Sequence, residues 1–238
     1  MFFFFRKPVT EIISLVPPEF EYALSYTPIK EASKCLPGWW KNLTVNKFDW
    51  ESLSLSRNAK TCPGINKTIT KGAILPLWTD LAIRIRNGEY KYQFADKRSM
   101  LSHHSNEQAP GFYSDHFIFK IRSPWFIKTK VPLHYSFPFY HFVNDPGYST
   151  PPGIVYPQGS ICATSIFIMM KQYQDCNLMI DRNTPLLHIL PVTEKKVIYR
   201  VEICDEIDHE RAKVFLGSNE TFVAARVKNE RLVKNNES

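Results

Sequence analysis

The sequence lacks the signals by which several function classes are recognised. It has no run of about 18 apolar residues, so we expect no transmembrane helix. Only 9 of its 238 residues are glycine, and none lies in a GxxxxGK[ST], GxGxxG or GxSxG pattern, which argues against the nucleotide-binding and serine-hydrolase motifs. Its 5 cysteines show no CxxC spacing. They therefore predict reduced thiols in a cytosolic setting rather than a disulfide framework.

Proline and aromatic residues, by contrast, are plentiful. The chain contains 17 prolines and 14% aromatic residues, and its apolar runs are short. This pattern is typical of many strands joined by rigid turns. We therefore expect a mainly β (α+β) fold: an antiparallel β-sandwich or a β-clip or barrel-like core, with short N-terminal helices. We expect residues 1–204 to form this domain and residues 205–238 to form a helical C-terminal appendage packed on the domain or on a partner.

The best local signals lie between residues 60 and 94. Pro63 favours a helix start because its missing N–H is not needed there, and Gly72 suits the left-handed end of that helix. Apolar and polar residues alternate from Leu77 to residue 86, which predicts a strand. The dipeptide Asn87-Gly88 then predicts a type I′ hairpin with a returning strand over 89–94.

Further elements follow from similar patterns. Pro17 and Pro18 predict that residues 9–21 form an edge strand and turn. The polar run 95–111 predicts a loop, and Ser123-Pro124 predicts an interruption between two strands. The other expected strands are 112–121, 125–128, 133–142, 154–156, 161–170, 185–192 and 196–203. A helix capped by Asp205 or Asp208 and a second one reaching residue 234 are expected after them.

Histidines raise the hypothesis of an iron or zinc site, because two His and one carboxylate bind ferrous iron in oxygenases. The metal candidates are His103, His104, Asp115, His116 and His141, with His134 and His188 as further histidines. A His-x-Asp or His-x-Glu pair is absent, and the adjacent Asp115 and His116 are expected on opposite faces of a strand. Ordinary packing is the favoured interpretation, and His188 is expected to be a hydrogen-bonded core residue. No resident cofactor is therefore expected.

Apolar residues near both ends indicate contacts with protein partners. Trp39 and Trp40 are an aromatic pair that can serve either as a binding platform or as a plug of the core. Phe2 and Phe3 belong to an apolar arm, which is followed by Arg6 in the reverse of the charge order of a secretory signal. Phe222 and Leu232 lie on a narrow apolar stripe of the expected C-terminal helix. These residues predict a homo-oligomer or an assembly with other chains.

The net charge of +7 leaves nucleic acid as an alternative partner. The basic residues are spread along the chain and form no known nucleic-acid-binding motif. Nucleic-acid binding through this charge therefore stays open as one hypothesis among others.

Two family resemblances add context. The segments GIVY at 153–156 and NTPLLHI at 183–189 resemble motifs of the β-clip deoxyuridine triphosphatases. Val155 stands where that family has its catalytic aspartate, so this resemblance, over residues 152–191, implies architecture and trimerisation but no activity.

The second resemblance covers residues 30–195. It lies in LPGWWK at 36–41, KTCPGI at 60–65, residues 72–78, SPWFIKT at 123–129 and residues 184–191. These landmarks resemble an uncharacterised family of proteins encoded by T4-like tailed phages of marine bacteria and cyanobacteria. The resemblance implies a phage context, with localisation in the virion or the host cytoplasm.

Together these observations predict a non-enzymatic phage-type structural or accessory protein that binds other protein chains, as a virion component or a host-takeover factor. One alternative is an enzyme, either a metal-dependent oxygenase or a nucleotide binder of the β-barrel or β-clip type. The other alternative is a nucleic-acid-binding accessory protein.

Overall fold

The computed structural model describes residues 9–44, 47–49, 51, 54–56, 58–104, 114–157, 161–208 and 210. The fold is mainly β and sandwich-like, with a few short helices, as the sequence predicts. The strands are β1 Val9–Val16, β2 Lys30–Glu31, β3 Lys47–Asp49, β4 Ser54–Ser56, β5 Ala73–Pro76, β6 Leu81–Arg86, β7 Glu89–Phe94, β8 Leu101–His104, β9 His116–Lys128, β10 Leu133–Ser136, β11 Gly153–Val155, β12 Ile161–Lys171, β13 Cys176–Ile180, β14 Pro185–Pro191 and β15 Lys196–Ile203. The α-helices are α1 Tyr22–Tyr26, α2 Gly38–Asn42 and α3 Pro63–Thr70, and the 3-10 helices are η1 Pro18–Phe20, η2 Ala32–Lys34, η3 Ala59–Thr61 and η5 Phe139–His141.

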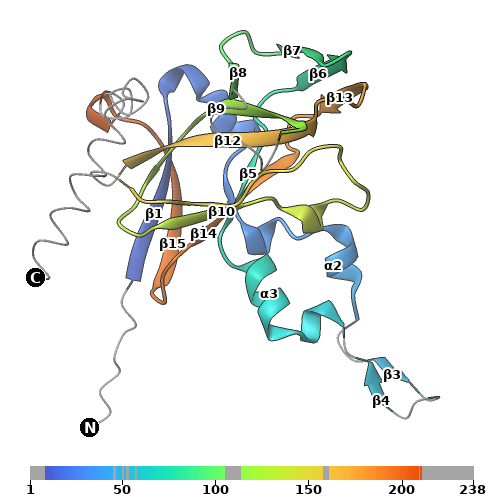
Figure 1. Ribbon diagram of the computed structural model, residues 1–238. Coiled ribbons are helices and arrows are strands. Elements are labelled where there is room, and N and C mark those ends of the chain that lie inside the picture. The colour runs from blue at the N-terminus through green and yellow to red at the C-terminus, as the bar shows by residue number, and fades with distance from the viewer. Residues whose placement is uncertain are drawn as a thin grey trace, which may run out of the picture.

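The strands form two large sheets and two small ones. Sheet A has the order β12-β9-β1-β15, and β8 also pairs with β9. Sheet B has the order β11-β10-β14-β5-β2, β13-β6-β7 form a third sheet, and β3-β4 pair alone. All pairs are antiparallel except β1 with β15, which are parallel. Figure 1 shows β9 and β12 above β10, with α2 and α3 below β10 and the β3-β4 hairpin below these helices.

One hydrophobic core joins the three larger sheets. Its largest fully buried side chains are Trp78 before β6, Trp125 and Phe119 of β9. The same cluster includes Ile166 of β12 and Leu187 of β14, so sheets A and B bury their facing sides against each other. This packing is the main stabilising term, since burial of apolar surface drives such sandwiches.

Local turn signals are confirmed. The helix starts at Pro63 and ends at Thr70, and Gly72 follows with φ +92°. A Cβ at Gly72 would collide with the backbone carbonyl of Ile189, so only glycine fits there. Asn87 and Gly88 have φ values of 50° and 76°, as a type I′ turn between β6 and β7 requires. The strand predicted from Leu77 begins only at Leu81.

The prediction of an edge strand at residues 9–21 is wrong. β1 lies inside sheet A, between β9 and the distant β15. The two prolines follow Val16, so they remove no donor from the strand itself. A nearby proline therefore ends β1 but does not place it at an edge.

Two predictions around β9 are also wrong. The expected loop 95–111 contains β8, which pairs with residues 118–121 of β9. Ser123-Pro124 does not interrupt the chain into two strands, because β9 runs without a break from His116 to Lys128. The partner register shifts between Ala163 and Ser165 of β12, opposite this proline. A β-bulge of this kind leaves a residue without a ladder hydrogen bond, which is where proline is tolerated.

The start of the predicted C-terminal appendage is described as far as residue 210. The Asp205 carboxylate accepts a 2.7 Å hydrogen bond from the Asp208 backbone N–H, as a helix N-cap does. The buried Asp208 in turn receives a 2.6 Å hydrogen bond from the Lys128 ammonium of β9. Asp208 is therefore held against sheet A, and residues 209 and 211–238 of the predicted appendage lie outside the described part. No helix among the described residues is long and apolar enough to cross a membrane.

Candidate functional site

The predicted metal residues lie in separate places. Asp115 and His116 do meet, because Asp115 precedes β9 and its carboxylate lies 2.7 Å from His116 Nδ1. That hydrogen bond lowers the pKa of the Asp115 carboxyl. The expectation that these two side chains point to opposite faces is therefore wrong, since the alternation of a strand starts only at His116.

His103 and His104 project from opposite faces of β8. The His103 ring lies 5.4 Å from that of Phe117 on the core side, and burial lowers the pKa of this imidazole. The His104 ring lies 5.2 Å from that of Phe167, which belongs to β12. Within the described ranges, no group of three or more His, Cys, Asp or Glu side chains is arranged to hold a metal ion.

His188 is the hydrogen-bonded core residue that the sequence predicts. It is 1% exposed, and its Nε2 donates to the Lys71 carbonyl over 2.8 Å. Its Nδ1 then accepts from the Tyr140 hydroxyl over 3.1 Å, and burial lowers the pKa of the imidazole. Nearby, burial and the proximity of His188 lower the pKa of His141 to about 4. Both nitrogens of His188 are thus engaged by the fold.

Trp39 and Trp40 lie in different environments. Trp40 is 3% exposed and packs against Ile69, Ile74 and Tyr140, so it fills a small core beside α3. Trp39 is 39% exposed, and its indole N–H donates to the Tyr140 carbonyl over 2.8 Å. The candidates Phe2, Phe3, Phe222 and Leu232 lie outside the described residues.

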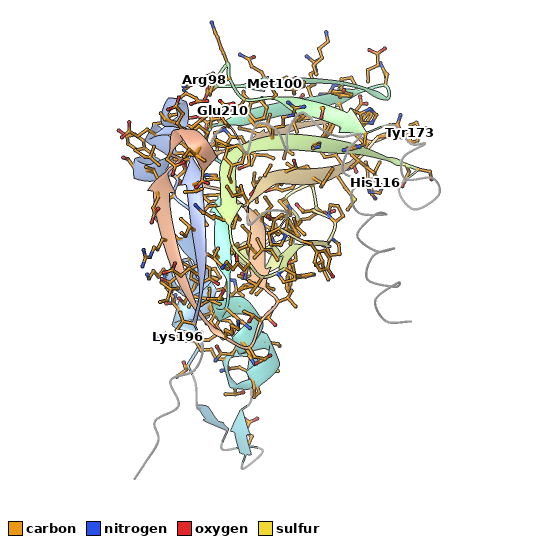
Figure 2. All side chains as sticks on the ribbon, turned by 90° about the vertical axis from the view of Figure 1, so that its left-hand side faces the viewer. Arg98, Met100, His116, Tyr173, Lys196 and Glu210 are labelled. Atoms are coloured by element: carbon orange, nitrogen blue, oxygen red, sulfur yellow. The ribbon has the colours of Figure 1, made fainter. Side chains whose placement is uncertain are left out.

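A polar cleft of about 430 Å³ lies near the start of β9. His116, Asp145, Lys171 and Cys176 are among its lining residues, and Figure 2 shows His116 and Tyr173 on this side of the molecule. Asp145 already accepts a 2.9 Å bond from the Gly147 backbone N–H, and Asp115 is bonded to His116. The carboxylates of Asp145 and Asp115 are therefore already hydrogen-bonded within the fold.

A second, mainly apolar cleft lies between β12 and the segment that leads into β11. It measures about 440 Å³, and most of its lining is apolar. Ala163, Ser165 and Phe167 of β12 form one wall, and residues 150–155 form the other. Ile154, on this second wall, is an exposed large hydrophobic residue. Exposed apolar surface beside a groove is a common mark of an interaction site.

The backbone of β12 faces this cleft. The Ser149 and Met169 backbones exchange both N–H···O bonds, at 3.1 and 2.8 Å, so the Met169 polar groups point away from β9. Gln172 N–H instead donates to the Asp115 carbonyl on the β9 side. Because these directions alternate along a strand, the N–H and C=O groups of Phe167 and Ser165 also point away from β9.

These groups mark an open strand edge. β12 is the terminal strand of sheet A, and past Met169 the 150–155 segment leaves it to pair with β10. Among the described residues, neither Ser165 nor Phe167 has a strand neighbour on that side. A row of outward N–H and C=O groups is a template for one more strand.

Two cations lie next to this edge. Lys120 and Arg122 of β9 are the cross-strand partners of Phe167 and Ser165. Burial, followed by the nearby Arg122 guanidinium, lowers the pKa of the Lys120 ammonium. No ion pair to either cation occurs in the described part of the chain. The edge therefore carries uncompensated positive charge beside an apolar cleft.

Comparisons with protein-family models, curated proteins and solved structures find no match to this chain. The family resemblances predicted from the sequence thus gain no support from them. The site rests on the geometry of the chain itself.

Sequence reasoning did not single out the β12 edge. One signal was present: between Ile161 and Met170 there is no charged residue, whereas natural edge strands usually carry one. Reading that signal required knowing that this strand lies at an edge, which depends on distant pairings.

Proposed function

We propose that this protein is a non-enzymatic binding protein that takes up an extended segment of a partner chain along the β12 edge. The observation that carries the proposal is the outward direction of the Ser165 and Phe167 backbone groups beside the apolar cleft. Strand addition of this kind gains affinity from main-chain hydrogen bonds and specificity from pockets for alternate side chains.

The positive charges of Lys120 and Arg122 favour a partner segment with acidic side chains. A strand added at β12 lies two strands away from Lys120 and Arg122, roughly 10 Å by ordinary strand spacing. Acidic side chains on that strand are attracted to the two cations, most strongly at low salt, because this separation slightly exceeds the Debye length of about 8 Å at physiological ionic strength. The partner segment is therefore extended and acidic, with apolar residues at alternate positions.

The same charges disfavour a second copy as the occupant. Pairing two β12 edges about a two-fold axis would bring both cation pairs into one continuous sheet, roughly 14 Å or three strand spacings apart, where their mutual repulsion is weak but unfavourable. The role in a phage virion or in host takeover is part of this proposal, and the family resemblance in the sequence is what supports it.

Labelled synthetic peptides test the proposal. The probe is a peptide of about seven residues in which glutamate and valine alternate, matched to the length of a typical strand. Binding is measured by fluorescence anisotropy. We expect binding by the acidic peptide and at least about tenfold weaker binding by the same peptide with lysine in place of glutamate.

N-methylated peptides separate strand addition from simple charge attraction. Methylating every glutamate amide and, separately, every valine amide removes opposite rows of donors without changing the charge. One row faces β12 and the other faces away, so only one of the two peptides should lose binding. Equal binding by both methylated peptides would overturn strand addition. Dimerisation of the protein that the peptide reverses would identify the occupant as a second copy instead.

A further inference from the structure

The three-stranded sheet of β13, β6 and β7 has one face in the core and one face in solvent. Leu81, Ile83 and Ile85 of β6 point into the core, where each is at most 1% exposed. The residues between them lie on the outer face, together with their cross-strand partners on β7 and β13. Figure 1 shows these three strands together at the upper right of the molecule.

The outer face carries two like charges directly opposite each other. Arg84 of β6 and Lys91 of β7 are cross-strand partners, and both are exposed. Neither side chain forms an ion pair or a hydrogen bond with any described residue. Like charges in this arrangement destabilise a sheet, so an anion bound at the pair would remove a cost that the free protein bears.

The carboxylates near this pair lie beside the next arginine of β6. Arg86 Nε lies 3.9 Å from an oxygen of the Asp175 carboxylate, and Glu89 is the cross-strand partner of Arg86. The charge of Arg86 is thus compensated, whereas Arg84 and Lys91 keep theirs. The positive charge of this face is therefore concentrated at one place.

A hollow of about 440 Å³ lies beside the two cations. Its lining includes six residues of the outer face, namely Ala82, Arg84, Lys91, Gln93, Asn177 and Met179. Ala82 stands between Met179 of β13 and Gln93 of β7, so its single methyl group leaves room between two longer side chains. Met179 is 62% exposed, and exposed apolar surface beside a hollow is a mark of a binding site.

These groups match the parts of one nucleotide. Arginine and lysine are the usual partners of a phosphate oxygen. A base has a flat apolar face, which suits Ala82 and Met179, and polar edges, which suit the amides of Gln93 and Asn177 because an amide both donates and accepts. In a duplex the bases are stacked and paired, so only a single strand can turn a base into a hollow. An acidic peptide would satisfy the cations but has no flat ring for the hollow.

We infer that this outer face binds single-stranded nucleic acid, with the phosphate backbone at Arg84 and Lys91 and a base over Ala82. The site is separate from the β12 edge, because its lining shares no residue with the apolar cleft there. It therefore adds a second binding surface to the proposed function and does not depend on it.

Charge variants test the phosphate contacts. The probe is a fluorescein-labelled single-stranded DNA of about ten nucleotides, a usual site size for such proteins, and binding is measured by fluorescence anisotropy. Arg84→Gln combined with Lys91→Gln should weaken binding by about tenfold or more. The slope of log affinity against log salt should become shallower by roughly 0.7 for each phosphate that the pair contacts.

The matched control removes the same two charges from another exposed strand. Lys196→Gln combined with Arg200→Gln on β15 should change DNA binding by less than about twofold. An equal loss in both double variants would show that only net charge matters and would overturn the site.

A DNA probe without bases tests the hollow. Abasic DNA of the same length carries the same phosphates, and we expect it to bind roughly tenfold more weakly than the intact strand. Ala82→Leu fills the hollow without changing the charge, on a solvent-facing position where the protein should keep its fold, as checked by circular dichroism. It should weaken binding of intact DNA by about fivefold or more and change abasic DNA by less than about twofold. Equal binding of the two DNAs would overturn the base contact.

The acidic peptide probe separates this inference from the proposed function. Arg84→Gln combined with Lys91→Gln should leave peptide binding at β12 within about twofold. If this variant loses the peptide and keeps the DNA, the face belongs to a protein partner and the inference is wrong. No DNA binding by the unaltered protein at low salt would also overturn the inference and would leave strand addition standing.

Discussion

The two edges of sheet A differ in the way they meet solvent. β15 is exposed along most of its length and carries Lys196, Arg200 and Glu202, with Arg200 in a 3.0 Å ion pair to Glu11 of β1. β12 has no charge before its last residue, and its side chains are buried or half-buried. Charged side chains are a usual means of keeping an edge from pairing with other chains. β15 is thus a protected edge, and β12 is an edge left open.

The difference shows that a strand at the edge of a hydrogen-bonded sheet can still place its side chains in the centre of the hydrophobic core. β12 pairs with only one long strand, yet Ile166 and Ile168 lie in the main core. Packing therefore holds β12 rigid while its outer backbone remains ready to pair. A rigid, preformed edge lowers the ordering cost of binding an extended segment.

The largest expected effect tests this packing difference. Ile166 is fully buried in β12, whereas Ile198 of β15 is 39% exposed. Ile166→Ala should lower the free energy of unfolding by about 2–5 kcal/mol, and Ile198→Ala by less than about 1 kcal/mol, because only the first leaves a cavity. Urea denaturation measures both. Equal losses would contradict the assignment of β12 to the core.

Charge variants test the edges against each other. Lys120→Glu combined with Arg122→Glu should weaken binding of the acidic probe by about tenfold, or roughly 1.4 kcal/mol. Lys196→Glu on β15 is the control and should change it by less than about twofold; Figure 2 shows Lys196 at the lower end of the molecule, away from His116. The effect of the double variant should shrink as salt rises. A similar loss from the β15 variant would mean that only net charge matters.

Acidification should lower the stability of the folded protein. The folded-state pKa of His141 is lowered to about 4 from an ordinary value of 6.5, and that of His188 is lowered as well. Between these values the unfolded chain binds more protons, so stability falls as pH drops from about 6.5 towards 4. Denaturation midpoints across this range measure the slope, and His141→Gln should make it shallower. An unchanged slope would contradict the buried, neutral state of His141.

The smallest expected effect concerns the cleft itself. Tyr135→Phe removes a buried hydroxyl that lies beside Thr164 and Cys162, so it should change the free energy of unfolding by no more than about 1 kcal/mol. The same limit should hold for Thr164→Val. A loss of more than about 1 kcal/mol in thermal or urea unfolding would contradict this limit.

Local signals predicted much of the secondary structure. Pro63, Gly72 and Asn87-Gly88 fix backbone conformations through their own φ preferences, so their turns are readable without any tertiary context. The mainly β character follows in the same way from short apolar runs between prolines. The strand β13, by contrast, has alternating burial but little apolar contrast in its sequence, and we did not predict it.

Long-range pairing could not be predicted from such signals. The placement of β1 depends on β15, which lies far away in sequence, and the tolerance of Pro124 depends on a bulge opposite β12. The candidate site has the same origin. Tyr135 reads as one more aromatic residue of the sequence, and only the meeting of β10, β11 and β12 shows that it lines a cleft.

Amide hydrogen exchange along β12 tests the central claim most directly. The claim is that the Ser165 and Phe167 N–H groups point to the cleft, while those of Ile166 and Ile168 bond to β9. In the free protein we predict fast exchange at Ser165 and Phe167 and slow exchange at Ile166 and Ile168, with protection appearing at the first two when the acidic probe is added. Uniform protection of all four amides in the free protein, or no change at Ser165 and Phe167 on binding, would contradict it.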